Sequence, residues 1–373
     1  MAASGCGGAD RAVTPDQLRA DREVRQDAYE TGREVVVGRL ADRIEAGDRT
    51  VDVLVLSGGG QHGAFGAGFL NGWADRGDGS FPEFDVVTGI STGSLIAPFA
   101  FLGTEAALDL VAGMYRNPDR IAPDRDLIGA LFRRTGGLFD TSRLAETLAE
   151  VYDAEAIAQL QEGFSDRRQL FIGTTDLDLG RGRVWDLSRE ADTTAAGVER
   201  MNRILLASSA IPGAFPPVEL DGNFHTDGGV TTNLLATDLQ LLQALAAELQ
   251  ARGVEEPVTV RLWAIVNLFL SPAVQAVNAG SFQAVSARSN GLLFALHQQE
   301  TLTRLWEISE AVNAGVEGLT MEVHYAAIPD EWATRPGAME LFNEPYMNAL
   351  QDYAYERAQS AEPWGPLPPG PFE

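Results

Sequence analysis

Residues 84–97 read FDVVTGISTGSLIA and combine a short apolar run, a Gly-x-Ser-x-Gly pentapeptide and a second apolar run. The pattern predicts a buried strand that ends in a sharp turn at Ser91 and is followed by a helix. Gly89 and Gly93 suit such a turn because a side chain at either place would crowd the backbone. Ser91 would then lie at the start of the helix, where amide N–H groups and the helix dipole favour negative charge. The pentapeptide therefore predicts a nucleophilic serine.

Apolar runs alternate with helical patterns over most of the chain. Buried strands are expected at 51–56, 84–88, 170–175, 258–266 and 319–326, with shorter strands at 184–187, 218–220 and 223–226. Helices are expected at 14–46, 64–76, 91–102, 104–116, 141–161, 199–208, 236–252, 281–312 and 338–357. This alternation favours an α/β fold in which helices cover a mostly parallel central sheet. The lead at 1–12 and the proline-rich tail at 363–371 are expected to be loose.

The charge of the chain limits the kinds of partner that it can have. Its 373 residues include 53 acidic and 28 basic side chains, and the formal net charge is −25. Such a surface repels the phosphates of nucleic acids, so no nucleic-acid partner is expected. All the basic residues are arginine, which excludes lysine-based Schiff-base chemistry and a Walker-type phosphate loop.

Cys6 is the only cysteine of the chain. This excludes an internal disulfide and a cysteine-based metal site, and no other metal-ligand spacing is present, so we expect neither a metal nor a cofactor. Residues 3–8, ASGCGG, resemble the end of a bacterial lipoprotein signal. They predict a protein of the bacterial cell envelope, or a secreted one, that is lipid-anchored through Cys6. The alternative is a cytoplasmic protein in which Cys6 has no role. No apolar run approaches the roughly 20 residues of a membrane span.

A glycine-rich loop follows the first predicted strand, with Gly58, Gly59 and Gly60 in succession. Since these residues lack Cβ atoms, their backbone N–H groups can turn outward and form a nest of donors for an oxyanion. Residues 58–63 also fit the dinucleotide fingerprint Gly-x-Gly-x-x-Gly, with acidic residues at 75 and 78 near the expected distance. The loop alone supports both interpretations equally. The serine turn downstream favours the oxyanion hole, because a dinucleotide site has no use for that serine.

Asp227 begins a second glycine turn, Asp-Gly-Gly, directly after a short predicted strand. Such a sequence is often only turn chemistry, but a nucleophilic serine needs a base within hydrogen-bond reach. The usual candidates for that base are the four histidines, His62, His225, His297 and His324. The patterns around His297 and His324 predict packing positions. A carboxylate that acts directly on the serine would need no histidine.

Four motifs occur in a fixed order: GGGQHG at 58–63, GISTG at 89–93, ASSAIPGAFPPV at 207–218 and DGG at 227–229. In this order they strongly resemble the patatin-like phospholipases, over roughly residues 51–235. The resemblance implies a three-layer α/β/α patatin-like fold and a serine acyl hydrolase with a Ser–Asp dyad. It assigns Ser91 as the nucleophile and Asp227 as the base. The oxyanion donors would be the amides around Gly58, Gly59 and Gly60.

The resemblance also implies a reaction and an organisation of the chain. We expect cleavage of lipid acyl esters, of the phospholipase A, lipase or esterase type, through an acyl-enzyme and without a metal or cofactor. A lipid is the expected partner, peripheral contact with a membrane is compatible with it, and the oligomeric state is left open. Residues 174–186 are similar to a bacterial branch of the family. We assign 1–50 to a lead and helix, 51–250 to the catalytic domain and 251–373 to a C-terminal α/β extension packed on the same domain.

Three other functions remain as alternatives. Acyl transfer to an acceptor other than water would use the same site. A nucleotide-binding α/β protein would use the glycine-rich loop on phosphates, would bind NAD or a nucleotide, and would not react with serine-directed phosphonates. A surface lipoprotein could also bind lipid without turnover, although the intact motifs argue against an inactive site.

Two of the histidines lie within or beside these motifs. His62 stands where the glycine-rich loop of the family usually carries Arg or Lys, which predicts a preference for neutral esters or an altered pH dependence. His225 is two residues before Asp227 and would point to the same side of an extended segment. His225 is therefore an auxiliary candidate beside the base.

Overall fold

The structure is a computed structural model that describes residues 13–47, 49–121, 137, 139–271 and 274–366. The predicted lead at 1–12, which includes Cys6 and the lipoprotein-like segment, lies outside these ranges, so lipid anchorage through Cys6 stays a prediction. Within the described ranges, no helix combines the length and the apolar character that crossing a membrane requires.

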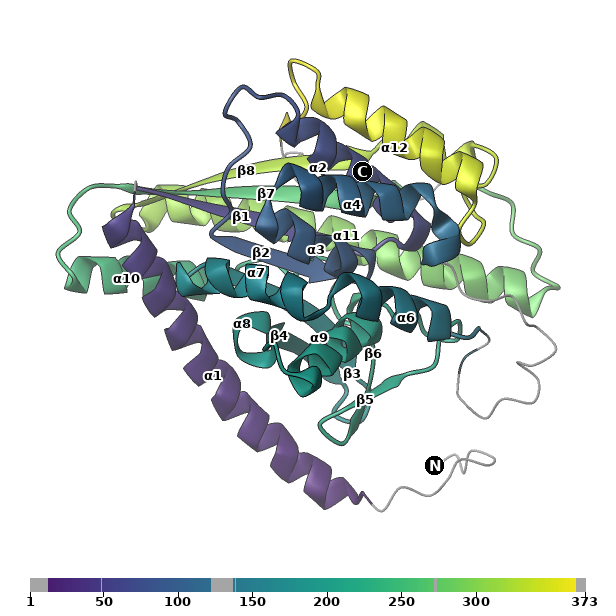
Figure 1. The fold of residues 1–373 in the computed structure, drawn as a ribbon, viewed down its shortest axis with the longest axis horizontal. Helices are drawn as coiled ribbons and strands as arrows, with labels where there is room; N and C mark the ends of the chain where they lie inside the picture. Colours follow the sequence, from purple (N-terminus) through teal and green to yellow (C-terminus); the bar gives the residue numbers. More distant parts are fainter. Residues whose placement is uncertain (1–12, 48, 122–136, 138, 272–273, 367–373) are drawn as a thin grey trace.

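One sheet forms the centre of the molecule (Figure 1). Its described strands are β1 (Thr50–Leu56), β2 (Val86–Ile90), β3 (Gln169–Asp176), β4 (Arg181–Asp186), β5 (Val218–Leu220), β6 (Asn223–Asp227), β7 (Val258–Phe269), β8 (Leu319–Ile328) and β9 (Gly365–Pro366). They run in the order β5-β6-β3-β2-β1-β7-β8-β9, and β4 pairs with β3 beside this path. The central pairs β3–β2, β2–β1, β1–β7 and β7–β8 are parallel, whereas β4, β5, β6 and β9 pair in antiparallel fashion.

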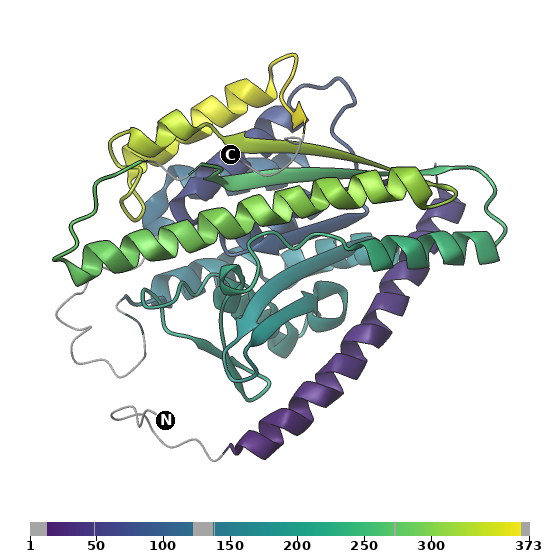
Figure 2. The same ribbon diagram turned by 180° about the vertical axis from the view of Figure 1, so that it is seen from behind.

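Helices cover both faces of the sheet, as Figures 1 and 2 show from opposite sides. One face carries α2 (Gly63–Ala74), α3 (Thr92–Leu102), α4 (Glu105–Arg116), α6 (Ser142–Val151), α7 (Ala154–Ser165), α9 (Ala195–Ser208) and α12 (Glu344–Ala358). The other face carries α1 (Pro15–Ala46), α10 (Leu239–Ala251) and α11 (Phe282–Gly315). A separate apolar core fills each side of the sheet. The predicted α/β fold with a mostly parallel, helix-covered sheet is confirmed.

Residues after 250 extend the sheet that holds the two glycine motifs. β7 pairs with β1, β8 pairs with β7, and α12 packs into the same apolar core as α2. The C-terminal third of the chain therefore completes the central sheet rather than forming a separate layer. Its strands lie next to the strand that leads into the glycine-rich loop.

Several predicted boundaries were wrong; α9, for example, begins at Ala195 instead of 199. The helix expected at 141–161 is divided into α6 and α7, because the Asp153 side chain accepts the backbone N–H groups of Glu155 and Ala156 and starts a new helix. The last helix begins at Glu344 instead of 338, after Asn343 caps its first turn. The tail is ordered at its start, where β9 pairs with β8.

Candidate active site

Ser91 lies at the carboxyl end of β2 with φ 53° and ψ −125°, directly before α3. A positive φ is uncommon for a residue other than glycine, and such strain is frequent at reactive sites. A Cβ on Gly89 would come within 2.5 Å of the carbonyl oxygen of Gly93. A Cβ on Gly93 would come within 2.4 Å of the carbonyl oxygen of Leu56. Both glycines are therefore required by the close packing of this turn.

Strand β3 brings Asp227 to Ser91. The first part of β3 pairs with β2, ending at the pair Gly173–Ile90, and the next part pairs with β6, beginning at Thr174–Asp227. Because β4 occupies the other edge of β3 along both parts, β2 and β6 lie on the same side of it. The two strands thus meet end to end, and the residue after β2 adjoins the last residue of β6.

The Ser91 hydroxyl lies near enough to the carboxylate of Asp227 to favour its charged form. The backbone N–H of Gly229 donates a hydrogen bond to this carboxylate, with N···Oδ1 of 2.8 Å. Both Ser91 and Asp227 are only 5% exposed. Burial raises the pKa of Asp227 to about 6, although the nearby Ser91 hydroxyl and the Gly229 N–H both lower it. A carboxylate with this pKa is a stronger base than an ordinary aspartate and is still ionised at neutral pH.

The glycine-rich loop lies against the serine. A Cβ on Gly58 would be 3.0 Å from the Cβ of Ser91, so only glycine permits this approach. The N–H of Gly58 is used by the carbonyl oxygen of Asn233, with N···O of 3.3 Å. Among the residues that the structure describes, the N–H groups of Gly59 and Gly60 have no acceptor. These two amides are the donors that the loop leaves available for an oxyanion.

Three polar residues that hold this arrangement carried no assigned role in the sequence. Ser208 Oγ accepts the N–H of Ser91 at 3.0 Å and donates to the carbonyl oxygen of Gly173 at 2.7 Å, which fixes the serine turn to β3. Asn233 Nδ2 donates to Oε1 of Gln298 at 2.6 Å. Asn267 lies at the end of β7.

The side chain of Asn267 links the end of β1 to α2, on either side of the glycine-rich loop. Its side chain donates to the carbonyl oxygen of Ser57 at 2.9 Å and accepts the N–H of Gly66 at 2.9 Å. A Cβ on Gly59 would lie 1.9 Å from the carbonyl oxygen of Asn267. Two signals in the sequence could have marked these residues. Ser208 belongs to the small-residue motif at 207–218, and Asn267 is a polar residue that interrupts an apolar run.

His62 packs against the glycine-rich loop. Its Nδ1 lies 3.1 Å from the carbonyl oxygen of Gly59, and its ring makes edge contacts with Phe269 and Tyr346. Burial lowers the pKa of His62 to about 4. At neutral pH this position therefore carries an uncharged ring where the family usually has a cation.

His225 is fully buried, and its polar contacts are with Thr174 and Asp176 rather than with Ser91 or Asp227. Nδ1 lies 3.0 Å from the hydroxyl of Thr174, and Nε2 lies 3.6 Å from Oδ2 of Asp176. The ring also packs against Trp185. Burial lowers the pKa of His225 to about 4, although the charge of Asp176 opposes this effect. The structure thus places His225 in a neighbouring buried network.

The structure does not place the acidic residues of the dinucleotide fingerprint near the glycine-rich loop. Asp75 and Asp78 lie between α2 and β2, at the amino edge of the sheet, whereas the glycine-rich loop lies at the carboxyl edge. Asp75 accepts the hydroxyl of Tyr355, and Asp78 pairs with Arg76. In the described part of the chain, no three His, Cys, Asp or Glu side chains are grouped as a metal ion would require.

Known proteins match the part of the chain that contains this site. Residues 54–239 match the family model described as "Patatin-like phospholipase". A protein of Invertebrate iridescent virus 6 named "Probable lipid hydrolase 463L" is 28% identical over 184 residues, which are 48% of this chain and 60% of that protein. The chain thus spans less than two thirds of that relative's length. VipD from Legionella pneumophila is similar over 83% of this chain and 66% of its own, with 11% identity and a TM-score of 0.35. Because the matched segment contains the serine turn, the glycine-rich loop and the Asp-Gly-Gly turn, residues 54–239 belong to the patatin-like phospholipase family.

Proposed function

We propose that the protein is a serine acyl hydrolase that cleaves lipid acyl esters with a Ser91–Asp227 dyad. The observation that carries this proposal is the strand pairing that sets the Ser91 hydroxyl beside the buried carboxylate of Asp227, whose pKa is raised to about 6. A serine hydroxyl is a weak nucleophile until a base accepts its proton, and Asp227 is in position to do so without a histidine.

The proposed reaction has two steps. In the first, Asp227 accepts the proton of Ser91 while Oγ attacks the acyl carbonyl carbon, and the amides of Gly59 and Gly60 bind the oxyanion. The carbon–oxygen bond to the alcohol then breaks, and the alcohol oxygen takes the proton from Asp227. In the second, water loses a proton to Asp227 and attacks the acyl carbon, with the oxyanion again at the two amides. The bond from Ser91 Oγ to the acyl carbon then breaks, Oγ takes the proton back from Asp227, and the carboxylic acid leaves. Acyl transfer would differ only in the acceptor of this second step.

The substrate class follows from the family and from the charge near the loop. The viral relative is named for lipid hydrolysis, which supports a lipid ester over a peptide or a small polar ester. The uncharged ring of His62 offers no counter-ion to an anionic headgroup. We therefore propose neutral or zwitterionic esters, such as glycerides and phosphatidylcholine, as preferred substrates.

The first half of α11 is the surface that we propose for contact with a lipid interface. The helix has 34 residues and is about 51 Å long, whereas β8 has 10 residues and spans about 33 Å. Its second half packs into the apolar core, and Gln298 contacts Asn233 beside the glycine-rich loop. The residues before Gln298 therefore project past the carboxyl edge of the sheet, where Ser91 lies.

The composition of this projection differs from the rest of the chain. Arg288 is the only charged residue between positions 261 and 300, although 22% of the whole chain is charged. Val285 and Leu296 are exposed apolar side chains of this half of α11, and Val274 and Val277 are exposed in the segment just before the helix. A nearly uncharged apolar surface suits a neutral or zwitterionic lipid layer, which the remaining acidic surface would not attract.

The test is labelling with a fluorophosphonate probe, followed by peptide mass spectrometry. We expect label on Ser91, loss of label in Ser91→Ala, and retained label in the matched control Ser94→Ala, whose hydroxyl donates only to the carbonyl oxygen of Ser91. Release of fatty acid from phosphatidylcholine should be lost in Ser91→Ala and in Asp227→Asn. Full hydrolysis by a folded Asp227→Asn protein would exclude the dyad. Absence of label together with binding of NAD would favour the nucleotide alternative.

A further inference from the structure

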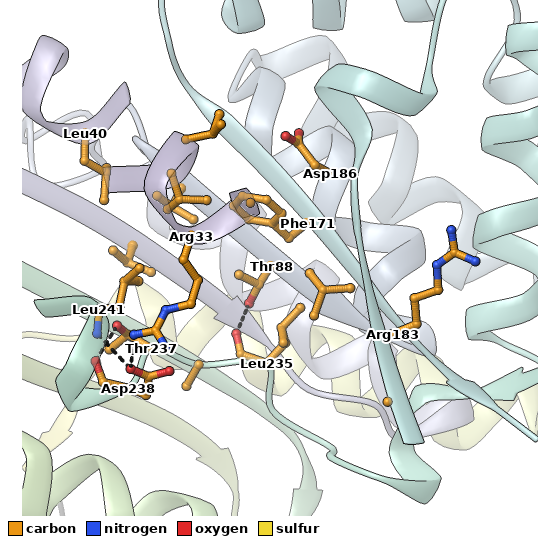
Figure 3. A pocket seen from close by; sticks show the side chains of 18 of the residues that line it. Arg33, Leu40, Thr88, Phe171, Arg183, Asp186, Leu235, Thr237, Asp238 and Leu241 are labelled. Carbon is orange, nitrogen blue, oxygen red and sulfur yellow. Dashed lines mark hydrogen bonds and ion pairs between the residues drawn. The ribbon is translucent and has the colours of Figure 1, made fainter. Parts of the chain in front are cut away.

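A cavity of about 530 Å³ lies between α1 and the face of the sheet that α10 and α11 cover (Figure 3). Its floor comes from four neighbouring strands and consists of Val51, Val53, Val86, Thr88, Phe171 and Val260. Leucines of α10 line one wall, and the β3–β4 hairpin lines the opposite wall. Neither Ser91 nor Asp227 is among the lining residues. The cavity is therefore separate from the candidate active site.

One face of α1 forms the roof of the cavity. Arg25, Gly32, Val36 and Leu40 line it and recur at intervals that keep them on one side of a helix. Apart from its chain neighbours and the backbone of its own helix, no described atom lies within 4 Å of the position that a Cβ on Gly32 would take. Glycine destabilises a helix interior relative to alanine, so its place here has no benefit for the helix itself. Its effect is to leave open space between α1 and the sheet.

Ion pairs hold this roof over an apolar interior. On one side, Arg33 reaches from α1 to Asp238 at the start of α10, with N···O of 3.3 Å, as Figure 3 shows. On the other side, Nη1 of Arg25 lies 3.5 Å from Oδ2 of Asp176. The same carboxylate oxygen also accepts a hydrogen bond from Asn223. The roof is thus fixed at both walls by charges at the rim.

The Arg25 end of the cavity has an unused hydrogen-bond donor. Nη1 of Arg25 is buried and makes no hydrogen bond to any residue that the structure describes. Arg181 lies at the same end, across the hairpin from Asp176, and its Nη1 has a neutral partner, Gln26, at 3.4 Å. An acceptor with one negative charge would complete the hydrogen bonding at this end.

We propose that the cavity binds one long-chain fatty acid, with its chain between α1 and the sheet and its carboxylate at Arg25. The apolar floor and walls favour a hydrocarbon chain, and the volume lies within the range of small-molecule sites. The carboxylates of Asp176, Asp186, Glu190 and Asp238, which also line the cavity, disfavour a headgroup of higher negative charge, such as a phosphate monoester. This proposal does not depend on the proposed activity of Ser91.

The test measures oleate binding by calorimetry, with Ser91→Ala as the parent protein so that no turnover interferes. Gly32→Phe should fill the cavity and weaken binding by about tenfold or more. Gly38→Phe is the matched control, because Gly38 is in the same helix, also has no atom within 4 Å of a Cβ, and does not line the cavity. It should change the affinity by less than about twofold. Gly32→Met serves as the smaller replacement if the phenylalanine variant does not fold.

The headgroup is tested with Arg25→Gln. This change should weaken the binding of oleate by about tenfold but leave the binding of oleyl alcohol unchanged. The proposal is overturned if the parent protein binds no oleate, if Gly32→Phe and Gly38→Phe lose affinity equally, or if Arg25→Gln affects both ligands alike. It is also overturned if phosphonate label on Ser91 of the wild-type protein blocks oleate binding. Ester hydrolysis by Gly32→Phe, made with Ser91 intact, is measured separately, so the two proposals can fail independently.

Discussion

The buried carboxylate of Asp227 determines how activity should depend on pH. Asp227 can accept the proton of Ser91 only when it is ionised, and its pKa is about 6 instead of the ordinary 3.8. At pH 5 only about a tenth of Asp227 would be ionised, whereas a carboxyl group with the ordinary pKa would be more than about nine-tenths ionised. The value of kcat/KM should therefore fall about tenfold between pH 8 and pH 5 and continue to fall below that.

The same burial should destabilise the folded protein above pH 6. The difference between 3.8 and about 6 corresponds to about 3 kcal/mol in favour of the protonated form. In the unfolded chain Asp227 loses its proton near pH 4, and in the folded chain near pH 6, so folding stability falls as the pH rises through this window. Asp227→Asn removes the charge at every pH. Its unfolding free energy should exceed that of the wild type by up to about 3 kcal/mol at pH 8 and by little below pH 4.

Two assays on the same pair of proteins check this reasoning. Hydrolysis of p-nitrophenyl butyrate, which is soluble, gives kcat/KM as a function of pH without a lipid interface. Urea unfolding at pH 4 and pH 8 gives the stability difference between the wild type and Asp227→Asn. An acid limb near pH 4 would mean that Asp227 has an ordinary pKa. A stability difference that does not change with pH would refute the argument from burial even if the variant is inactive.

The glycine-rich loop, His62 and α11 each carry a further expectation. Gly59→Ala should lower kcat about 100-fold, because its Cβ would lie 1.9 Å from the carbonyl oxygen of Asn267 and displace an oxyanion donor. Gly60→Ala meets no neighbouring atom and has only the strain of an alanine at φ 57°, so it should lose less than about tenfold; equal losses would contradict the assignment. His62→Phe removes the Nδ1 contact with the carbonyl oxygen of Gly59 but no charge at pH 7, so kcat there should stay within about twofold; a large loss would mean that this contact positions the loop. Leu296→Glu should weaken sedimentation with phosphatidylcholine vesicles and leave butyrate hydrolysis unchanged. Unaltered vesicle binding would locate the lipid contact elsewhere.

The sequence was informative where the chemistry is local. The turn around Ser91 could be predicted because its two glycines are needed within five consecutive residues, and the close contacts of Gly89 and Gly93 give the reason. The fold class followed from the alternation of strands and helices. Helix ends were less certain, because a capping side chain such as Asp153 can interrupt an otherwise continuous helical pattern.

The supporting residues could not be predicted because the sheet brings them together. Ser208 bonds to Ser91 across 117 positions of sequence, and Asn267 bonds to Ser57 across 210. Neither pairing has a local pattern, since both depend on which strands are neighbours. The cavity under α1 has the same origin: a helix near the start of the chain covers residues from four strands. Only Gly32, an unfavourable residue within a helix, gives a trace of it in the sequence.

In the proposed dyad, the end-to-end meeting of β2 and β6 along β3 also removes the need for a histidine between the serine and the acid. A histidine bridges the distance between a nucleophile and a carboxylate when different elements hold them apart. Here the strand pairing places the carboxylate directly against the hydroxyl, and burial raises its pKa toward neutrality, which is the property that an imidazole would otherwise supply. The strained backbone of Ser91 and the buried charge of Asp227 both destabilise the fold at this point. The N–H of Ser91 donates to Ser208 Oγ and the N–H of Gly229 donates to Asp227, which holds the two residues in place. In the proposed mechanism the geometry of β3 thus substitutes for a third catalytic residue.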